Sequence, residues 1–239
     1  MCPTCDSHED SRRRFLSGLV AGVAAAGASS LTPARAADGP TTSLSADQAL
    51  ARLKAGNQKF VTAPDVCAAE LAQRRSAVAK AQSPWATILS CADSRVPPEL
   101  LFGGVGVGEL FVARNAGNMA DTATMGTIEY GAVVLGVPLI VVLGHERCGA
   151  VASACEVVDK NTQFPGSIGP MVEAIVPAAR SVKGRPGDFV DNAVRENAIR
   201  TARRIGSESP LVADLVGKGK VRVVAARYDL DDGRVQFYG

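Results

Sequence analysis

The sequence predicts a single α/β domain with a mostly parallel central sheet of four core strands flanked by helices, plus a C-terminal edge strand. Short apolar runs of strand length alternate with longer segments of helical periodicity, which is typical of a parallel sheet. Two of the apolar runs end in polar turns that carry cysteine. The part of the chain that looks globular, about 200 residues, is long enough for one domain with a sizeable core.

Four apolar runs predict the core strands, at 86–90, 109–114, 139–143 and 221–226. Each run is short, and glycine, proline or charged residues border it, which favours a strand over a buried helix. Asp231-Asp232-Gly233 is a turn signal. Residues 235–238 behind this turn are expected to return as the edge strand.

Helices are expected at 68–82, before the first strand, and between later strands at 121–135, 170–182 and 188–205. A further helix precedes the first strand. It begins after Ser45, whose hydroxyl can cap it, and Leu50, Leu53 and Phe60 recur at near-helical spacing. A polar stretch that contains proline and glycine is expected directly after Val151. The sequence shows no internal repeat.

Residues 1–36 carry the pattern of an export signal, so the folded domain is expected over 37–239. Ser11–Leu16 holds a twin-arginine pattern, a moderately apolar stretch follows, and Ala34-Arg35-Ala36 supplies the small residues of a cleavage site. The apolar stretch is short for a membrane span, which takes about 20 residues. An uncleaved N-terminal anchor is the alternative. We expect export of the folded protein by the twin-arginine machinery, cleavage near Ala36 and a periplasmic location.

Charge and cysteine content narrow the range of functions. The formal net charge of +2 argues against a nucleic-acid partner, which usually demands a basic face. Cys2 and Cys5 form a C-x-x-C motif, but it precedes the export signal and lies in no βαβ pattern, so redox chemistry is not expected of it. Four other cysteines follow the signal: Cys67, Cys91, Cys148 and Cys155. The pairing of Cys67 stays open, and Cys155 is interpreted as a small apolar residue of a helix.

Two strand ends carry residues that bind metal ions. His145 and Cys148 follow the third strand, and they would lie on one face if a helix began there. Cys91 and Asp93 follow the first strand. Because parallel sheets bind ligands at their carboxyl edge, we expect the two turns to lie together. Cys91, His145 and Cys148 would then hold Zn²⁺, which favours nitrogen and sulfur, with Asp93 or a water molecule in the fourth position.

This ligand set predicts a catalytic zinc. A catalytic zinc keeps one position exchangeable for water, whereas a structural zinc is closed by four protein ligands, often on a small knuckle. Here three Cys and His ligands come from two distant strands, and a carboxylate lies nearby. Such a zinc lowers the pKa of its water to about 7, so that hydroxide forms at neutral pH.

These motifs resemble those of the β-class carbonic anhydrases. Cys91-Ala-Asp-Ser-Arg95 is similar to the first zinc motif of that family, and His145-x-x-Cys148-Gly149 is similar to the second. The resemblance extends over roughly Leu44 to Tyr238, and it includes Arg114-Asn-Ala-Gly-Asn118, Thr127-Ile-Glu-Tyr130 and Tyr228-Asp-Leu230. It implies attack of zinc-bound hydroxide on carbon dioxide, which gives bicarbonate and a proton.

The resemblance also implies roles for individual residues. Arg95 is expected to pair with Asp93 and to pull its carboxylate off the metal, so that it accepts a hydrogen bond from zinc-bound hydroxide. In some members of the family this aspartate ligates zinc instead. Without the zinc motif, Asp93 would be interpreted as an Asx-turn residue. The residues implied to bind substrate, each otherwise an ordinary core or turn residue, are Gln82, Phe111, Ala116, Tyr130 and Gly149.

The expected partners follow from the resemblance as well. They are the small molecules carbon dioxide and bicarbonate, and a second copy of the chain, because the family forms homodimers or dimers of dimers with the pocket at the subunit interface. Two other functions stay open on the same zinc site. One is hydrolysis of another small linear molecule, carbonyl sulfide or carbon disulfide. The other is non-catalytic binding of bicarbonate or zinc.

Overall fold

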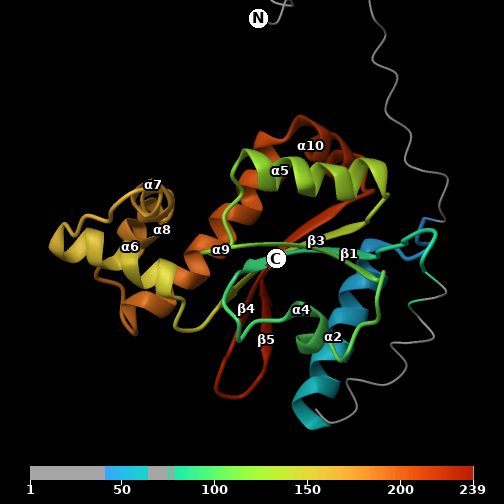
Figure 1. The fold of residues 1–239 in the computed structure, drawn as a ribbon, viewed down its shortest axis with the longest axis horizontal. Helices are drawn as coiled ribbons and strands as arrows, with labels where there is room; N and C mark the ends of the chain where they lie inside the picture. Colours follow the sequence, from blue (N-terminus) through green and yellow to red (C-terminus); the bar gives the residue numbers. More distant parts are fainter. Residues whose placement is uncertain (1–40, 64–74, 76–77, 239) are drawn as a thin grey trace, which may run out of the picture. The chain divides into compact units, whose positions relative to one another are not determined.

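A five-stranded sheet forms the centre of the protein in the computed structural model, which describes residues 41–63, 75 and 78–238 (Figure 1). The strand order is β2-β1-β3-β4-β5. The strands are β1 (Ala86–Cys91), β2 (Leu110–Asn115), β3 (Leu139–His145), β4 (Arg222–Tyr228) and β5 (Val235–Tyr238). The first four are parallel and β5 pairs antiparallel with β4. The predicted fold class is therefore confirmed, including the edge strand.

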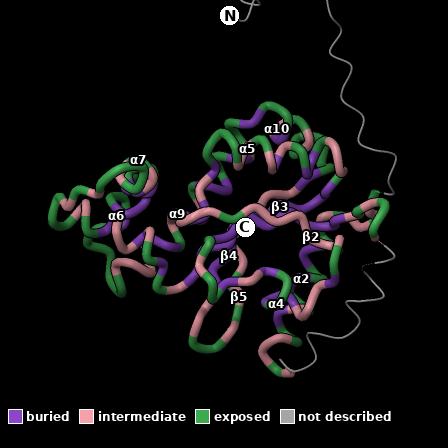
Figure 2. The backbone as a smooth tube through the Cα atoms, in the orientation of Figure 1, coloured by how far each residue is buried: buried purple, intermediate pink, exposed green. Residues whose placement is uncertain are grey.

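The two central strands, β1 and β3, are buried along their whole length (Figure 2). This explains why both are continuous apolar runs, since helices cover the two faces of a parallel sheet. Side chains alternate between the faces, as strand geometry requires. Ile88 and Val141 join one hydrophobic cluster, whereas Leu89 and Val142 join another on the opposite face.

Helices cover both faces of the sheet. On one face lie α2 (Ala46–Thr62) and the short α4 (Pro98–Leu101), and on the other lie α5 (Thr122–Glu129), α9 (Phe189–Glu208) and α10 (Pro210–Gly217) (Figure 1). A π-helix, η2 (Tyr130–Val134), continues α5. The predicted cap of the first helix is present, because the Ser45 hydroxyl accepts a hydrogen bond from the Gln48 N–H.

A third hydrophobic cluster lies beyond the carboxyl end of the sheet. It is built by α6 (Gly149–Lys160), α7 (Ile168–Glu173) and α8 (Val176–Val182), which pack with α9 at one end of the sheet (Figure 1). The cluster includes Cys91 and Cys148. The predicted metal ligands are therefore buried between the sheet and these helices.

Several helix predictions need correction. The expected polar stretch begins later than directly after Val151, because α6 runs to Lys160 with an apolar face of Val151, Ala154 and Cys155, and Cys155 lies in a helix as predicted. The helix expected at 170–182 is divided into α7 and α8, with Pro177 in the first turn of α8, where proline is tolerated but cannot continue a preceding helix. The helix α10 was not predicted at all.

Part of the sequence interpretation falls outside the described residues. The export signal, Cys67 and most of the helix expected at 68–82 lie there. Residues 78–80 form a turn, so that helix does not extend to Gln82. None of the helices in the described part of the chain combines the length and hydropathy that a membrane crossing requires.

Asn57 ties the first helix to two distant segments. Its amide Nδ2 donates to the carbonyl oxygens of Leu101 (3.0 Å) and Gly233 (2.9 Å), and its Oδ1 accepts from the Val235 N–H (2.8 Å). The side chain is buried. Asn57 thus satisfies three backbone groups that water does not reach freely, on α4 and on the β4–β5 hairpin.

We expect Asn57→Ala to destabilise the fold by on the order of 3 kcal/mol, because it leaves these three groups without partners. The shift of the denaturant unfolding midpoint measures this effect. Gln58→Ala, on the exposed side of the same helix, is the matched control and should change the midpoint little. Equal midpoints for both variants would contradict the assignment.

Candidate metal centre

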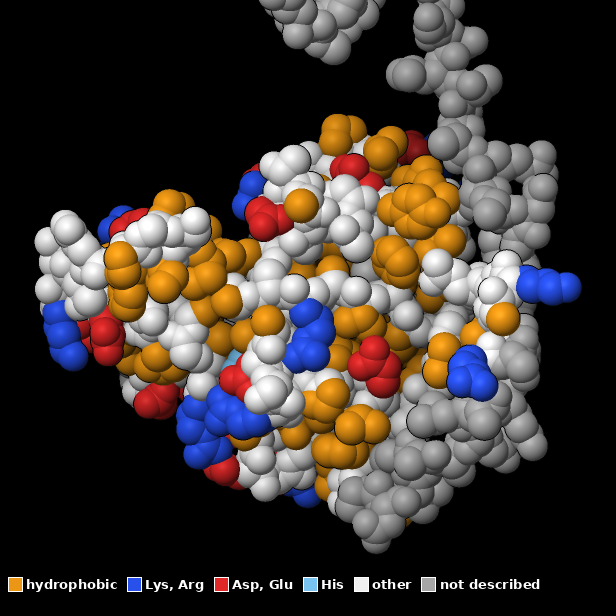
Figure 3. Space-filling model, in the orientation of Figure 1, with side chains coloured by type: hydrophobic (Ala, Val, Ile, Leu, Met, Phe, Trp, Pro, Cys, Tyr) orange, Lys and Arg blue, Asp and Glu red, His pale blue; other side chains and the backbone are white. Residues whose placement is uncertain are grey.

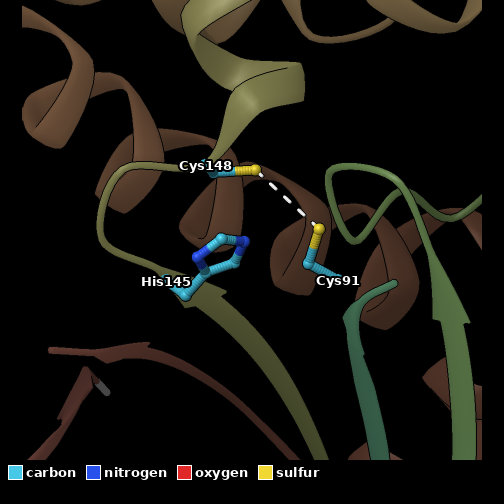
Figure 4. A group of neighbouring side chains, drawn as sticks. All are labelled: Cys91, His145 and Cys148. Carbon is cyan, nitrogen blue, oxygen red and sulfur yellow. Dashed lines mark hydrogen bonds between the residues drawn. The ribbon is translucent and has the colours of Figure 1, made fainter. Parts of the chain in front are cut away.

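Three buried side chains converge at the carboxyl edge of the sheet (Figure 4). Cys91 is the last residue of β1, His145 is the last residue of β3, and Cys148 is the N-cap of α6. The two sulfurs are 3.9 Å apart, and one donor atom from each residue lies within 4.8 Å of the other two. The parallel register of β1 and β3, which pairs Ser90 with Leu143, places the two strand ends side by side.

The local geometry between the ligands differs from the predicted one. His145 and Cys148 do not share a helix face, because α6 begins only after Cys148. Glu146 and Arg147 form a tight turn between them, and Arg147 adopts a left-handed backbone conformation with φ 52°. This turn, rather than helical spacing, brings Cys148 back toward the end of β3.

The histidine ring is set to ligate through one nitrogen. Its Nδ1 lies 2.8 Å from the carbonyl oxygen of Glu146, which can only accept, so Nδ1 carries the hydrogen. The other nitrogen, Nε2, is buried and has no hydrogen-bond partner among the described residues. An unpartnered buried nitrogen is costly. Its lone pair beside two sulfurs makes a donor set that fits Zn²⁺.

The two sulfurs lie within hydrogen-bonding distance of each other. Their mutual hydrogen bond lowers the pKa of Cys91 and raises the pKa of Cys148. The N–H of Gly117, 3.4 Å from the Cys91 sulfur, further stabilises that thiolate. A metal cation takes the place of the remaining proton when such a pair becomes a ligand pair. The sulfur chemistry therefore also fits zinc.

Asp93 is held by Arg95 rather than by the ligand set. Arg95 donates to Oδ1 from its backbone N–H and from Nε, both at 2.9 Å, and to Oδ2 from Nη2 at 2.7 Å. These bonds keep the pKa of Asp93 well below its usual range. Oδ2 lies 3.8 Å from Nε2 of His145, so the carboxylate borders the site. Asp93 is therefore paired with Arg95, as the resemblance implies for the arrangement in which the carboxylate is off the metal.

Two residues that the sequence interpretation did not assign to the site support it. Arg114 on β2 donates to the carbonyl oxygens of Cys91 (2.9 Å) and Asp93 (2.6 Å) and so fixes the turn after β1. Asn197 on α9 donates to the carbonyl of Gly117 at 2.9 Å. Asn197 is a buried amide in a mostly apolar helix stripe, which was the signal that could have identified it.

The residues implied to bind substrate fall into two groups. Ala116 lies between Asn115, which is paired with Cys91, and Gly117, and Gly149 directly follows Cys148. Both are therefore next to the ligands of their own chain.

The other group lies at the opposite end of the sheet. Phe111 is paired with Thr87, four residues before Cys91, which corresponds to about 13 Å along the strand. Tyr130 stacks on Phe111 with ring centroids 6.1 Å apart, and Gln82 precedes β1. Gln82, Phe111 and Tyr130 therefore do not lie beside the metal ligands of their own chain.

The fold and the site together define a mononuclear zinc enzyme. A buried set of two sulfurs and one nitrogen leaves a coordination position open, and a carboxylate held by an arginine borders it. Catalytic zinc sites have this form, with three protein ligands and an exchangeable fourth position.

Comparison with known proteins gives the family. The family model described as carbonic anhydrase matches residues 86–235. Carbonic anhydrase 2 of Mycobacterium tuberculosis is 36% identical over 182 residues, which cover 76% of this chain and 87% of that protein. A carbonic anhydrase of Mycolicibacterium smegmatis is 36% identical over 184 residues, covering 77% and 89%. The chain therefore belongs to the carbonic anhydrase family.

Solved structures agree with this assignment and give the class. The Coccomyxa β-carbonic anhydrase in complex with acetazolamide is 27% identical, with a TM-score of 0.59 over 78% of this chain and 85% of that one. A tetrameric β-carbonic anhydrase of Sordaria macrospora, 22% identical, shares the fold with a TM-score of 0.61 over 69% and 85%. The protein is a β-class carbonic anhydrase, and its cofactor is zinc.

The ligand assignment predicts a difference between two buried cysteines. Cys148→Ser should leave the purified protein with little or no zinc, because a serine hydroxyl is a poor substitute for a thiolate donor. Cys155→Ala should retain zinc. Cys155 lies on the same helix and is also buried, but it is not part of the group of Cys91, His145 and Cys148 whose donor atoms lie within 4.8 Å of one another. Metal analysis of both purified variants measures the difference, and zinc loss in Cys155→Ala would contradict the assignment.

Proposed function

We infer that this protein interconverts carbon dioxide and water with bicarbonate and a proton. The observation that carries this function is the buried group of Cys91, His145 and Cys148 with the Asp93–Arg95 pair beside it. Zinc held by the three ligands supplies a Lewis acid that generates a nucleophile from water near neutral pH. The protein's own groups orient and bind the reactants.

Asp93 is the main orienting group. Because Arg95 occupies both carboxylate oxygens and stabilises the charged form, Asp93 stays an acceptor at neutral pH and does not compete for the metal. Its remaining lone pairs accept a hydrogen bond from water at the site, which fixes the direction of the attacking oxygen. The proposal assigns binding of a substrate oxygen to the backbone N–H of Gly149, because N–H groups in the first turn of a helix such as α6 lack an intrahelical partner.

Stopped-flow hydration of carbon dioxide by the zinc-loaded protein tests the function. We expect fast hydration by the natural protein and a loss of at least about a hundredfold in kcat/KM for Asp93→Asn, with zinc content unchanged. Asp214→Asn on α10 is the control and should match the natural protein. No hydration by the fully zinc-loaded natural protein would overturn the proposal. Turnover of carbonyl sulfide or carbon disulfide in its place would assign the site to that substrate.

The proposed active unit is at least a homodimer. β2 lies at the edge of the sheet, and Val107, Tyr130 and Val133 near it are more than two-fifths exposed. Figure 3 shows hydrophobic side chains gathered over the far end of α5, where η2 follows. An exposed apolar patch beside an open strand edge is typical of a subunit interface.

Two-fold symmetry explains the split of the substrate residues. If two copies pair through β2, the strands run antiparallel, and the amino end of one faces the carboxyl end of the other. Phe111 and Tyr130 of each chain then approach the ligand set of the other chain. One active site therefore draws its ligands from one protomer and part of its pocket from the partner.

Light scattering should report a dimer or a larger species, and a complementation experiment tests the shared site. Cys91→Ser removes a ligand and Tyr130→Ala removes a pocket wall, so each variant alone should be severely impaired. After the two are mixed and reassociated, activity should rise above that of either parent, because a mixed dimer contains one intact site. A fully active monomer, or a mixture no more active than its parts, would contradict the proposal.

We also propose export of the protein through the twin-arginine pathway to the periplasm. The support is the sequence of residues 1–36, with its arginine pair, apolar stretch and small-residue cleavage site. A route that carries folded proteins suits an enzyme whose ligands are buried, because zinc can be bound before export.

Replacing the arginine pair should keep the precursor in the cytoplasm, since the receptor reads these two residues. We expect Arg12→Lys/Arg13→Lys to abolish export in cell fractionation, while Arg14→Lys is the neighbouring control and should be exported. Mass spectrometry of the exported protein should show an N-terminus just after Ala36. Equal export of the double variant would contradict the pathway, and an intact N-terminus would favour a retained anchor.

A further inference from the structure

One charged side chain lies buried on β4, where it is paired in register with Gly144, the residue before the ligand His145. Among the described residues, Arg227 on β4 is the one Arg, Lys, Asp or Glu with less than a tenth of its surface exposed. Its guanidinium contacts three carboxylates from three segments: Asp191 of α9 (2.5 Å), Asp229 after β4 (2.9 Å) and Glu146 after β3 (3.7 Å). Removing a charge from water costs free energy, and only close, well-oriented partners of opposite charge offset that desolvation penalty.

Glu146 connects this buried charge to the ligand turn. Its carboxylate accepts from the Leu230 N–H (3.1 Å) and pairs with Arg147 (3.1 Å) as well as with Arg227. Its own N–H donates to the Tyr228 carbonyl at 2.9 Å. Glu146, which lies between the ligands His145 and Cys148 in the chain, is therefore held both at its side chain and at its backbone.

The same residue sets the histidine tautomer. The carbonyl oxygen of Glu146 receives the Nδ1 hydrogen of His145, which leaves Nε2 for the metal. Arg147 follows in a left-handed conformation that costs energy in a residue with a Cβ. Its guanidinium pairs with Glu146 and Asp231, so the β4–β5 hairpin also holds the strained turn.

The acidic groups here do not form a second metal site. Carboxylate oxygens of Glu146, Asp229 and Asp231 lie within 4.8 Å of one another. Each of the three is already paired with Arg227 or Arg147. The cluster is an ion-pair network whose shared element is the ligand turn.

We propose that Arg227 is a positioning residue for the zinc centre and acts through Glu146. By fixing the Glu146 carboxylate, it holds the turn from His145 to Cys148 in the shape that presents Nε2 and the Cys148 sulfur together. The turn is thereby set before zinc binds. In this role Arg227 touches neither the metal nor the substrate, and its effect appears in metal affinity.

The test uses the full-length, zinc-loaded protein with His8→Ala, so that His145 is the one histidine left in the chain. Zinc affinity is measured by competition with a chromophoric chelator under reducing conditions. Exchange of the His145 Nδ1 hydrogen with water is followed by ring-labelled nitrogen NMR. We expect Arg227→Met to weaken zinc binding about 10- to 100-fold and to speed this exchange.

Further variants separate positioning from stability. Glu146→Ala keeps the backbone carbonyl but removes the carboxylate that Arg227 contacts, so it should reproduce both effects. The double variant, Arg227→Met with Glu146→Ala, should bind zinc no more weakly than the single variant with the larger loss of affinity. Asp191→Asn loosens Arg227 from α9 only and should retain zinc affinity. Arg234→Ala, on the exposed part of the same hairpin, is the control and should match the parent.

The proposal is overturned if Arg227→Met lowers the melting temperature while zinc affinity and Nδ1–H exchange stay as in the parent. It is also overturned if Asp191→Asn reproduces the affinity loss, because packing against α9 would then be the cause. If Arg227→Met does not fold, Glu146→Ala carries the test. An unchanged zinc affinity in that variant overturns the proposal equally.

Discussion

The pairing of β1 with β3 is the constraint on which the site depends. These neighbouring parallel strands end at the same edge, so residues far apart in the chain, Cys91 and His145, come within bonding reach of one ion. Helices on both faces of the sheet bury the two strands, and α6 to α8 cover the carboxyl end of the sheet. Cys91 and His145 stand on strand ends and Cys148 stands at the N-cap of α6, so none of the three ligands lies on a long loop.

The fold and the ligands could be read from the sequence because their signals are local. Apolar runs identified the strands, and cysteine and histidine directly after them identified the metal centre. Cys155 was expected in a helix, but the full length of α6 was not predicted because polar residues in its second half conceal a narrow apolar face. The tight turn between His145 and Cys148 was also missed, since a left-handed arginine has no sequence signature and is held by contacts with a distant hairpin.

The substrate residues show a different limit. Resemblance assigned Phe111 and Tyr130 to the pocket, yet the strand register places them far from the ligands of their own chain. No pattern within one sequence encodes which residues meet across a symmetry axis. The open edge of β2 and the exposed ring of Tyr130 supply the physical reason for a shared pocket. In the proposed dimer, folding of one chain and completion of one active site would be separate events.

The short distance between the Cys91 and Cys148 sulfurs has a consequence for the life of the enzyme. At 3.9 Å, the two atoms need to close by only about 2 Å to reach disulfide bonding distance. Zinc keeps both as thiolates bound to a common ion and thereby acts as a protecting group. In an oxidising compartment a chain that has lost its metal can be locked covalently in the empty state. In such a compartment, zinc would have to be bound before the oxidant is met for the chain to become active.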